Sequence, residues 1–326
     1  LPRATEGGAP VNTTPPDFRF GLIADIQYAD ADDAVFFAGV VRRYRGALNS
    51  VKAAVEAWTG SVSFVCQLGD IVDGRQTQGV ESLAALKTVQ ACLAPLKVPV
   101  YDVLGNHGLY TGLPRRALKA AGLFKASDAA CYYSFAPVPG WRFVVLDTCD
   151  VSVLSGDGRG VEVASAILSQ HNRNMWWHPR ANFTRGMPGL LRRFVPCNGA
   201  VSRAQLSWLR STLTAARHAG EAVVVFCHIP LCPLVCDDPV TLLWNFDEVL
   251  SALHVEGDGA VVAVFAGHAH TGGYAVDSHG IHHRTLESPL EVAPGEVAYA
   301  TVDVYSSPRT LVVRGGGVVP DLVMST

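Results

Sequence analysis

Side chains of metal-binding types follow five apolar segments of the chain. Each segment has the composition of a buried strand and ends in a turn with carboxylate, amide or imidazole groups. These groups belong to Asp25, Gln27, Asp70, Asn106, His107, His228, His268 and His270. A single such residue is usually part of a turn, but five successive strand ends place them where α/β sheets commonly build their sites. We interpret the set as a metal site.

Two divalent ions fit this mixture of donors. Carboxylate and amide oxygens together with imidazole nitrogens suit Mn²⁺, Fe²⁺ or Zn²⁺ and require no thiolate. Two ions about 3.5–4 Å apart can activate water, neutralise a phosphoryl group and stabilise the leaving oxygen. A bridging carboxylate must then hold the ions, because the two positive charges repel each other. The residue types therefore predict chemistry at phosphorus.

Alternating strands and helices are expected to position these residues. Apolar runs predict strands over 18–24, 62–68, 98–104, 141–146, 222–227 and 261–266. Apolar residues at helical spacing predict helices over 42–58, 82–93, 204–218 and 245–254, the third with a capping box at its start. Short strands with turns over 272–276, 281–286, 297–305 and 310–314 predict an antiparallel end to the sheet.

Two segments differ in character from this alternating pattern. Residues 1–16 are rich in Pro, Thr, Gly and Ala and are expected to form a loose N-terminal arm. Residues 17–326 are then expected to form a single domain. Within it, residues around 151–198 show little periodicity, so we interpret them as an insertion near the site. Whether this insertion closes as a lid is left open.

Composition narrows the range of partners and compartments. The chain is 49% hydrophobic and 17% charged with a net charge of −3, so no basic surface is expected for nucleic acid. The longest apolar stretch, 222–236, is interrupted by His228, Pro230 and Pro233 and is too short for a membrane span. Eight cysteines without a CxxC pair are interpreted as reduced thiols in a cytoplasmic protein. The oligomeric state is left open.

The motifs jointly resemble those of the calcineurin-like metallophosphoesterase superfamily. They are Asp25-x-Gln27, Gly69-Asp-Ile-Val-Asp73, Gly105-Asn-His107, the strand-end His228 and Gly267-His-Ala-His270. The segments 20–30, 67–74 and 265–274 are more closely similar to manganese-dependent ADP-ribose/CDP-alcohol diphosphatases, and the likeness runs from about Phe18 to Asp321. The wider superfamily has His where Gln27 stands, whereas Gln is usual in this family.

The resemblance implies a fold and a metal centre. The fold is an α/β metallophosphoesterase-type β-sandwich of two mixed sheets flanked by helices, in the order α/β/β/α, with the metals at one end. Four side chains would hold one ion, namely Asp25, Gln27, Asp70 and His270. Asp70 would bridge to a second ion held also by Asn106, His228 and His268. Mn²⁺ is the expected ion, with Fe²⁺, Zn²⁺ and Mg²⁺ as alternatives. The amide oxygen of Gln27 is a harder donor than the imidazole it replaces, which favours Mn²⁺.

His107 and several further residues are candidates for catalysis and substrate binding. The resemblance makes His107 a general acid or a phosphate-stabilising donor. The spacing of Asp73 suits either an outer partner of the metal ligands or a plain turn residue. Phe37, Arg43 and Tyr110 are candidate substrate contacts, although an anchored Phe and a solvated Arg explain the first two equally well. Segments 175–178 and 198–199 are expected to shape the pocket. The remaining histidines are interpreted as surface or structural residues.

The implied reaction is hydrolysis of the phosphoanhydride of ADP-ribose, CDP-alcohols and related nucleoside diphosphates, which are the expected small-molecule partners. The products would be a nucleoside monophosphate and a phosphorylated fragment. The alternative enzyme is a cyclic-nucleotide or other phosphodiesterase on the same metal scaffold. A metal-free scaffold that kept only the fold is a third reading, but such a protein should have lost ligands, and here every expected position is filled.

Overall fold

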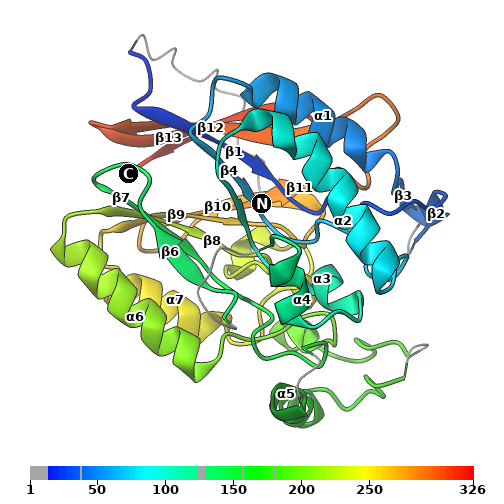
Figure 1. The fold of residues 1–326 in the computed structure, drawn as a ribbon. Coiled ribbons are helices and arrows are strands. Elements are labelled where there is room, and N and C mark those ends of the chain that lie inside the picture. Colours follow the sequence, from blue (N-terminus) through cyan, green and yellow to red (C-terminus); the bar gives the residue numbers. More distant parts are fainter. Residues whose placement is uncertain (1–13, 37–38, 124–129, 156–157, 179–180) are drawn as a thin grey trace.

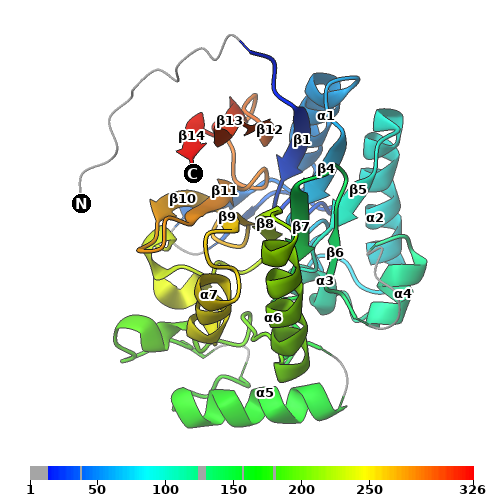
Figure 2. The ribbon, with the colours of Figure 1, turned by 90° about the vertical axis from the view of Figure 1, so that its left-hand side faces the viewer.

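Two six-stranded sheets pack face to face, and helices cover their outer surfaces (Figure 1). The computed structural model describes residues 14–326 except 37–38, 124–129, 156–157 and 179–180. Most of the expected N-terminal arm therefore lies outside the described residues. Figure 2 shows the layers from the side, with helices outside each sheet. The layer order is the α/β/β/α arrangement expected from the sequence.

The first sheet has a parallel half and an antiparallel half. Its strand order is β14-β13-β12-β1-β4-β5. The parallel strands are β1 (Phe18–Ile23), β4 (Phe64–Gln67) and β5 (Val100–Asp102). The antiparallel strands are β12 (Ala298–Ser306), β13 (Arg309–Gly317) and β14 (Leu322–Ser325). Helices α1 (Ala47–Trp58) and α2 (Val80–Leu93) lie on its outer side (Figure 1).

The second sheet is mostly parallel and has an antiparallel strand at each edge. Its strand order is β10-β11-β9-β8-β7-β6. The parallel strands are β7 (Trp141–Val145), β8 (Ala222–Phe226), β9 (Val261–Ala266) and β11 (His282–Glu287). The edge strands are β6 (Tyr133–Phe135) and β10 (Thr271–Val276). Helices α6 (Arg203–His218) and α7 (Phe246–Val255) cover this sheet (Figure 2).

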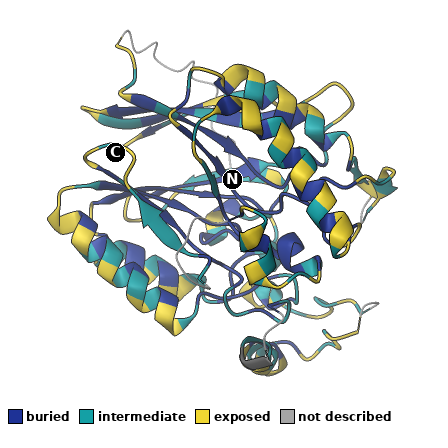
Figure 3. Cartoon of the chain, viewed as in Figure 1, coloured by how far each residue is buried: buried dark blue, intermediate teal, exposed yellow. Residues whose placement is uncertain are grey.

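Side chains alternate between two cores, because successive residues of a strand point to opposite faces. Phe20 and Phe64 stack between the sheets with ring centroids 5.1 Å apart, whereas Ile23 and Val65 belong to the core that includes the helices. Strands buried on both faces therefore read as continuous apolar runs. In Figure 3 the strands are largely buried and the helices expose their outer faces.

The segment interpreted as an insertion contains a helix that was not predicted. Helix α5 (Gly158–His171) lies apart from both sheets, at the lower edge of Figures 1 and 2. Its buried Ala164 and Leu168 belong to a small separate core with Phe194, Ala200 and Trp244. Val161, Ala164 and Leu168 recur at the three- and four-residue spacing of a helix, so a local signal for this helix is present in the sequence.

The helix expected over 42–58 begins later in the structure. Residues Val41–Arg42 form the short strand β3, which pairs with β2 (Ala34–Val35), and α1 starts only at Ala47. The backbone N–H of Arg43 donates to the Leu290 carbonyl at 2.8 Å, a contact made across the fold. Long-range pairing thus replaces the first helical turns that local periodicity indicates.

Two further observations bear on compartment and partners. All eight cysteines are free thiols, and Cys66, Cys131, Cys149, Cys227 and Cys232 are buried. In the part of the chain that the structure describes, no helix has both the length and the apolar character needed to cross a membrane.

Candidate metal centre

The carboxyl ends of five parallel strands meet at one end of the sandwich. Asp25 and Gln27 follow β1, and Asp70 follows β4. Asn106 begins the short helix α3 (Asn106–Tyr110) after β5, His228 follows β8, and His268 and His270 follow β9. All seven are buried except His268 and His270, which are partly exposed. The structure thus brings together every residue predicted as a metal ligand.

Asp25, Gln27 and His270 form one half of the centre. The Nε2 atom of His270 lies 2.9 Å from the amide nitrogen of Gln27 and 3.5 Å from Oδ1 of Asp25. Oδ1 of Asp25 and Oε1 of Gln27 are buried and have no hydrogen-bond partner among the described residues. Buried oxygens normally have such partners, so these two indicate a missing cation.

Asp70, Asn106, His228 and His268 form the other half. Nε2 of His228 lies 3.0 Å from Oδ1 of Asn106 and 3.2 Å from Oδ2 of Asp70. Asp70, His228 and His268 each offer a ligand atom within 4.8 Å of the others. Oδ2 of Asp70 also lies 3.5 Å from the amide nitrogen of Gln27. Asp70 therefore stands between the two halves, where a bridging carboxylate would have to lie.

Outer hydrogen bonds orient the rings of His228 and His270. Nδ1 of His228 lies 2.9 Å from the Leu68 carbonyl oxygen, which can only accept a proton. Nδ1 of His270 lies 2.6 Å from Oε1 of Glu291, and that carboxylate also accepts. In each ring Nδ1 is thus the donor. The Nε2 atoms face the centre, and such outer partners commonly fix metal-binding imidazoles in this way.

Asn198 orients the third imidazole, that of His268. Its Oδ1 lies 2.8 Å from Nε2 of His268. The amide nitrogen donates to three carbonyl groups, those of Arg193, Val240 and Leu242. Because these carbonyls hold the nitrogen end, the oxygen end must face His268. The imidazole then donates through Nε2, so that Nδ1 is left with the lone pair that a cation needs.

Four of the candidate ligands occupy left-handed backbone conformations. Their φ angles are +47° for Asp25, +42° for Gln27, +54° for Asp70 and +67° for His268. Among the described residues, Lys97 is the only other non-glycine residue with positive φ. Such a conformation costs on the order of 1–3 kcal/mol per residue and persists only when its surroundings enforce it. Its concentration in these turns marks them as a functional site.

Glycines beside the ligands allow side chains to approach closely. A Cβ atom on Gly105 would collide with Oδ1 of Asp70, and one on Gly267 would collide with Oδ2 of Asp25. The glycine of the Gly-Asn-His motif thus makes room for the ligand of a different motif. Likewise, the glycine of the Gly-His-x-His motif makes room for Asp25, the ligand of another motif. This close approach explains why a glycine stands directly before the ligands in both motifs.

Charges in the centre raise the pKa of two imidazoles and lower that of the third. Burial alone would lower the pKa of His228, but the Asp70 carboxylate raises it to about 9. Burial likewise opposes the shift of His270, but the nearby carboxylates of Asp25 and Glu291 raise its pKa to about 10. Burial, together with nearby His228, lowers the pKa of His268 well below its usual value. Metal-free protein therefore holds protons where cations would bind.

His107 lies at the start of α3, beside the candidate ligands. Its backbone N–H donates to Oδ1 of Asp70 at 2.7 Å. Its Nδ1 lies 3.3 Å from Oδ1 of Asp73, and the same oxygen accepts the backbone N–H groups of Arg75 and Gln76. Asp73 is thus both a turn residue and the neighbour of the His107 ring, so the two readings of its role do not exclude each other.

Comparison with known proteins identifies the family. The calcineurin-like phosphoesterase family model matches residues 18–272, most of the chain. The chain belongs to the calcineurin-like phosphoesterase family. A structure of a dimetal phosphatase from Danio rerio superposes with a TM-score of 0.87 at 38% identity, covering 95% of this chain and 99% of that one. The expected superfamily and the expected fold are both confirmed.

Curated relatives with a more specific name extend over nearly the whole chain. The manganese-dependent ADP-ribose/CDP-alcohol diphosphatase of Arabidopsis thaliana is 41% identical over 301 residues, which cover 91% of this chain and 94% of the relative. The human protein of the same name is 37% identical over 328 residues, which cover 94% of this chain and 92% of the relative.

The residues present fit the two ions that this phosphoesterase fold uses. The donors are carboxylate, amide and imidazole groups, which suit borderline divalent ions such as Mn²⁺. Their arrangement also fits, because Asp25 and Gln27 present unpaired buried oxygens and three imidazoles are turned by outer partners. Asp70 lies where both ions would need a shared ligand.

The predicted substrate contacts have different outcomes in this phosphoesterase. Phe37 lies outside the described residues. Arg43 donates through Nη1 to the Val292 carbonyl at 2.8 Å, so its guanidinium anchors a loop. Tyr110 lies edge-on to His107 with ring centroids 5.4 Å apart, next to the candidate catalytic group. Of the two substrate contacts that the structure describes, geometry favours Tyr110.

Three residues of the site were not assigned from the sequence. Asn198 was noted only as a pocket residue, while Glu291 and Arg75 were not singled out. Glu291 follows β11 and reaches His270 only in the folded chain, so no local pattern identifies it. Arg75 stands two residues after Asp73, the last residue of the Gly-Asp-x-x-Asp motif, and its guanidinium lies 4.5 Å above the Tyr110 ring. Position after a motif was the only available signal for Arg75.

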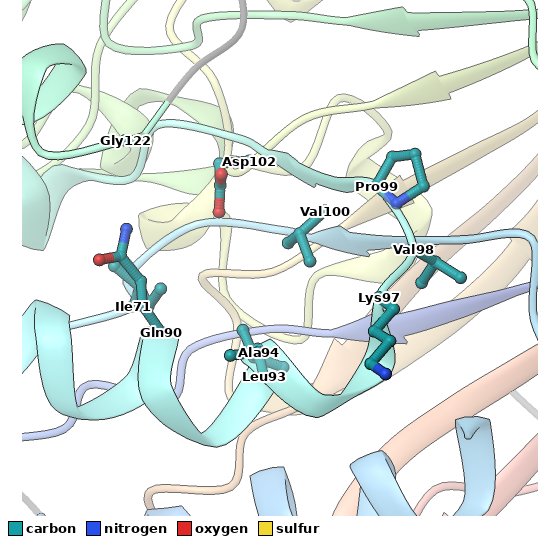
Figure 4. Close-up of a pocket in the computed structure, with 10 residues that line it drawn as sticks. All are labelled: Ile71, Gln90, Leu93, Ala94, Lys97, Val98, Pro99, Val100, Asp102 and Gly122. Carbon is teal, nitrogen blue, oxygen red and sulfur yellow. The ribbon is translucent and has the colours of Figure 1, made fainter. Parts of the chain in front are cut away.

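A cavity of about 340 Å³ lies away from the metal centre, between the end of α2 and β5 (Figure 4). Leu93, Lys97, Val100 and Asp102 are among its lining residues. None of the seven candidate ligands lines it, so we do not assign the reaction to this hollow.

Proposed function

We propose that this phosphoesterase hydrolyses the phosphoanhydride of ADP-ribose, CDP-alcohols and related nucleoside diphosphates with Mn²⁺ as its cofactor. The products are a nucleoside monophosphate and a phosphorylated fragment. The position of Asp70 between two sets of ligands is the observation that carries the dinuclear chemistry. Eight curated relatives support the substrate class. All eight share one name, and their sequences are 34–41% identical to this chain.

The seven candidate ligands divide between the two ions as their contacts suggest. Asp25, Gln27 and His270 hold one ion, and Asn106, His228 and His268 hold the other. Asp70 contributes to both. When bound, such a pair of ions activates water and stabilises the charge that develops at the phosphoryl group. The chain itself contributes the orientation of each ligand through Leu68, Asn198 and Glu291.

His107 stabilises or protonates the leaving oxygen. Its backbone is tied to Asp70 and its ring lies beside Asp73, so the ring is held next to the ions without serving as a ligand. This arrangement is that of a positioned general acid.

Arg75 binds the second phosphoryl group of the substrate. Its guanidinium is exposed, lies over the Tyr110 ring and donates to the Tyr110 hydroxyl at 2.8 Å. Tyr110 in turn lies beside His107. A guanidinium has five donors and pairs well with phosphate oxygens. We therefore assign to Arg75 the role expected for Arg43, whose guanidinium is engaged by backbone carbonyls.

Substrate profiling with defined metal content tests the proposed function. Chelation should abolish hydrolysis, and Mn²⁺ should restore it better than Mg²⁺, which imidazole serves poorly. ADP-ribose, CDP-choline and CDP-glycerol should be better substrates by kcat/KM than cyclic nucleotides or bis-p-nitrophenyl phosphate. Asp70→Asn protein is the inactive control, because it loses the bridging charge.

Two outcomes would overturn this proposal. Full activity of rigorously metal-free protein would exclude the dinuclear mechanism. Faster hydrolysis of cyclic nucleotides than of both diphosphate classes would favour the alternative phosphodiesterase.

We also infer that the protein is located in the reducing cytoplasm. We further infer that it has no nucleic-acid partner. The inference is supported by eight free cysteines, most of them buried, and by a net charge of −3. Denatured protein purified without reductant should titrate as eight thiols. A substantially lower thiol count would indicate disulfides and an oxidising compartment.

A further inference from the structure

The cavity between α2 and the edge of the first sheet lies apart from the metal centre. Its volume is about 340 Å³, and its walls come from the end of α2, the short 3-10 turn η2 (Ala94–Leu96) and strand β5 (Figure 4). Small-molecule sites commonly range from about 300 to 1,000 Å³. The cavity is thus large enough for a small ligand, and it contains none of the seven candidate metal ligands.

The walls of this cavity are mainly aliphatic. Six of the ten lining residues that the structure describes are apolar, namely Ile71, Leu93, Ala94, Val98, Pro99 and Val100. Three others, Gln90, Lys97 and Asp102, have polar side chains. Apolar walls with a few polar groups are the usual composition of a small-molecule site, in which the polar groups fix the orientation of the ligand.

One end of the cavity presents a carboxylate. The carboxyl group of Asp102 lies there, on the same side as Gln90 (Figure 4). Asp102 is only 7% exposed, so its charge is largely withdrawn from solvent. A carboxylate oxygen only accepts hydrogen bonds, and a ligand must therefore bring an N–H or O–H donor to this end. A carbonyl oxygen in the same place would be left without a partner and would cost binding free energy.

The other end has a lysine in a conformation that normally belongs to glycine. Lys97 follows η2 with a φ angle of +54°, and its exposed side chain lies at the end of the cavity away from Asp102 (Figure 4). Helices often end in this left-handed conformation, but the residue is usually Gly because a side chain strains it. Lys97 thus supplies a cation at a cost in backbone strain, and an ammonium group pairs well with phosphate oxygens.

These three features correspond to the parts of a nucleoside monophosphate. An amino group on the base donates to Asp102, in the way that carboxylates accept from the amino group of cytosine. The base and sugar lie against the aliphatic walls, and the phosphate meets Lys97. Adenine and cytosine have such an amino group, whereas hypoxanthine and uracil have a carbonyl oxygen in its place.

We propose that this cavity binds AMP or CMP, nucleoside monophosphates with an amino-substituted base, at a second site separate from the metal centre. Both compounds are products of the proposed reaction, but this inference goes beyond that reaction and its test measures binding alone. The bound ligand contacts Ile71, which follows Asp70 directly, and Asp102, which stands four residues before Asn106. The site therefore adjoins two of the strand ends that carry candidate metal ligands.

Equilibrium dialysis of the Mn²⁺-loaded enzyme against labelled AMP, CMP, IMP and UMP tests this site. The wild-type protein is compared with Lys97→Gly, Lys97→Arg, Asp102→Asn and Lys87→Ala proteins. Lys87 is exposed on α2 and does not line the cavity, so it is the matched control for loss of a lysine. The metal centre is the same in all five proteins, and nucleotide bound there cancels in the comparison.

The wild-type, Lys97→Arg and Lys87→Ala proteins should bind AMP and CMP in the cavity more tightly than IMP and UMP. Lys97→Gly should weaken AMP binding there by roughly 10–100-fold, the usual contribution of a hydrogen bond to a charged group. Asp102→Asn should lose the preference for AMP over IMP, because an amide group both donates and accepts. Glycine relieves the strained conformation at position 97, so the midpoint of thermal unfolding of Lys97→Gly protein should not fall.

Equal AMP binding by the wild-type and Lys97→Gly proteins would overturn the proposal and leave Lys97 as a charge at the end of α2. Equal binding of AMP and IMP by the wild-type protein would overturn it as well, because Asp102 would then not read the base. If Asp102→Asn protein fails to fold, the two Lys97 variants and the comparison of AMP with IMP decide the question. Failure to hydrolyse ADP-ribose would contradict the proposed function and leave these binding results unaffected.

Discussion

At the scale of single residues, the three imidazoles of the metal centre differ in what holds them. A neutral carbonyl group orients His228, an amide oxygen orients His268, and the Glu291 carboxylate orients His270. A charged acceptor makes the stronger hydrogen bond and increases the basicity of the ring more than a neutral one. Removal of the Glu291 carboxylate should therefore lower the affinity for metal ions, although Glu291 is not itself a candidate ligand.

Glu291→Ala should weaken Mn²⁺ binding by about 10–100-fold, as is typical when an outer partner of a metal ligand is removed. Glu291→Gln keeps an acceptor for the Nδ1 proton of His270 and should have a smaller effect. Free Mn²⁺ measured by electron paramagnetic resonance during titration gives both affinities. Wild-type affinity in Glu291→Ala protein would contradict the role assigned to this carboxylate.

His107→Ala should keep both ions and lose about 10²–10⁴-fold in kcat, the usual contribution of a general acid. The reason is that His107 lies beside Asp70 and Asp73 but is not needed as a ligand. Metal content is measured beside steady-state kinetics, with Asp70→Asn as the metal-deficient control. Loss of the ions in parallel with activity would make His107 a ligand or a structural residue.

Arg75→Ala should mainly raise KM for diphosphate substrates. A hydrogen bond to a charged group contributes about 1.5–3 kcal/mol, which corresponds to roughly 10–100-fold. Hydrolysis of bis-p-nitrophenyl phosphate should change little, because that compound has no second phosphoryl group. Arg43→Ala is the comparison, and it should lower stability with little change in KM. If Arg43→Ala has the larger effect on KM, the two assignments must be exchanged.

At the scale of structural elements, the insertion supplies a residue that the metal centre uses. Helix α5 and the segment after it build a small core of their own, and the chain then leads to Asn198 beside His268. Asn198 is fully buried and also holds the carbonyls of Val240 and Leu242. The insertion therefore contributes directly to the orientation of a candidate ligand, whether or not it moves.

Leu168→Ala should destabilise the protein by about 2–4 kcal/mol, because Leu168 is fully buried in the small core next to α5. Val163→Ala on the same helix is the matched control, since Val163 is 47% exposed and its truncation should cost little. Denaturant unfolding of both variants measures the difference. Equal effects would show that α5 does not depend on this core.

At the scale of the whole molecule, protons and metal ions compete for the same groups. His228 and His270, with pKa values raised to about 9 and 10, are protonated in metal-free protein at pH 7. Each must lose its proton to coordinate an ion. Mn²⁺ affinity should consequently rise with pH up to about 10, by as much as tenfold per pH unit for each proton released.

Mn²⁺ titrations at pH 6.5, 7.5 and 8.5 measure this dependence. Calorimetry in buffers of different ionisation enthalpy counts the released protons directly. A dissociation constant independent of pH over this range would show that the imidazoles are already neutral before the ions bind.

Much of the fold and of the candidate centre could be derived from the sequence. Strands β1, β4, β8 and β9 are buried almost throughout on both faces, so each appears as an apolar run that ends at its polar turn. The ligand motifs are short and contiguous, and three of them begin with a glycine, namely Gly69, Gly105 and Gly267. The identity of the candidate ligands is therefore local information.

Other features depend on contacts between distant segments. The start of α1 was placed too early because Arg43 pairs with Leu290. Glu291 joins the centre only because the chain after β11 returns to the end of β9. No periodicity within either segment encodes such contacts.

By itself, then, the sequence determined which side chains can bind the ions, because strand, turn and ligand are adjacent in the chain. Only the tertiary structure decided how those side chains are held. Asn198 lies 70 residues from His268, and Glu291 lies 21 residues from His270. The orientation of an imidazole depends on which acceptor meets its outer nitrogen, and packing of the two sheets and the insertion sets that partner.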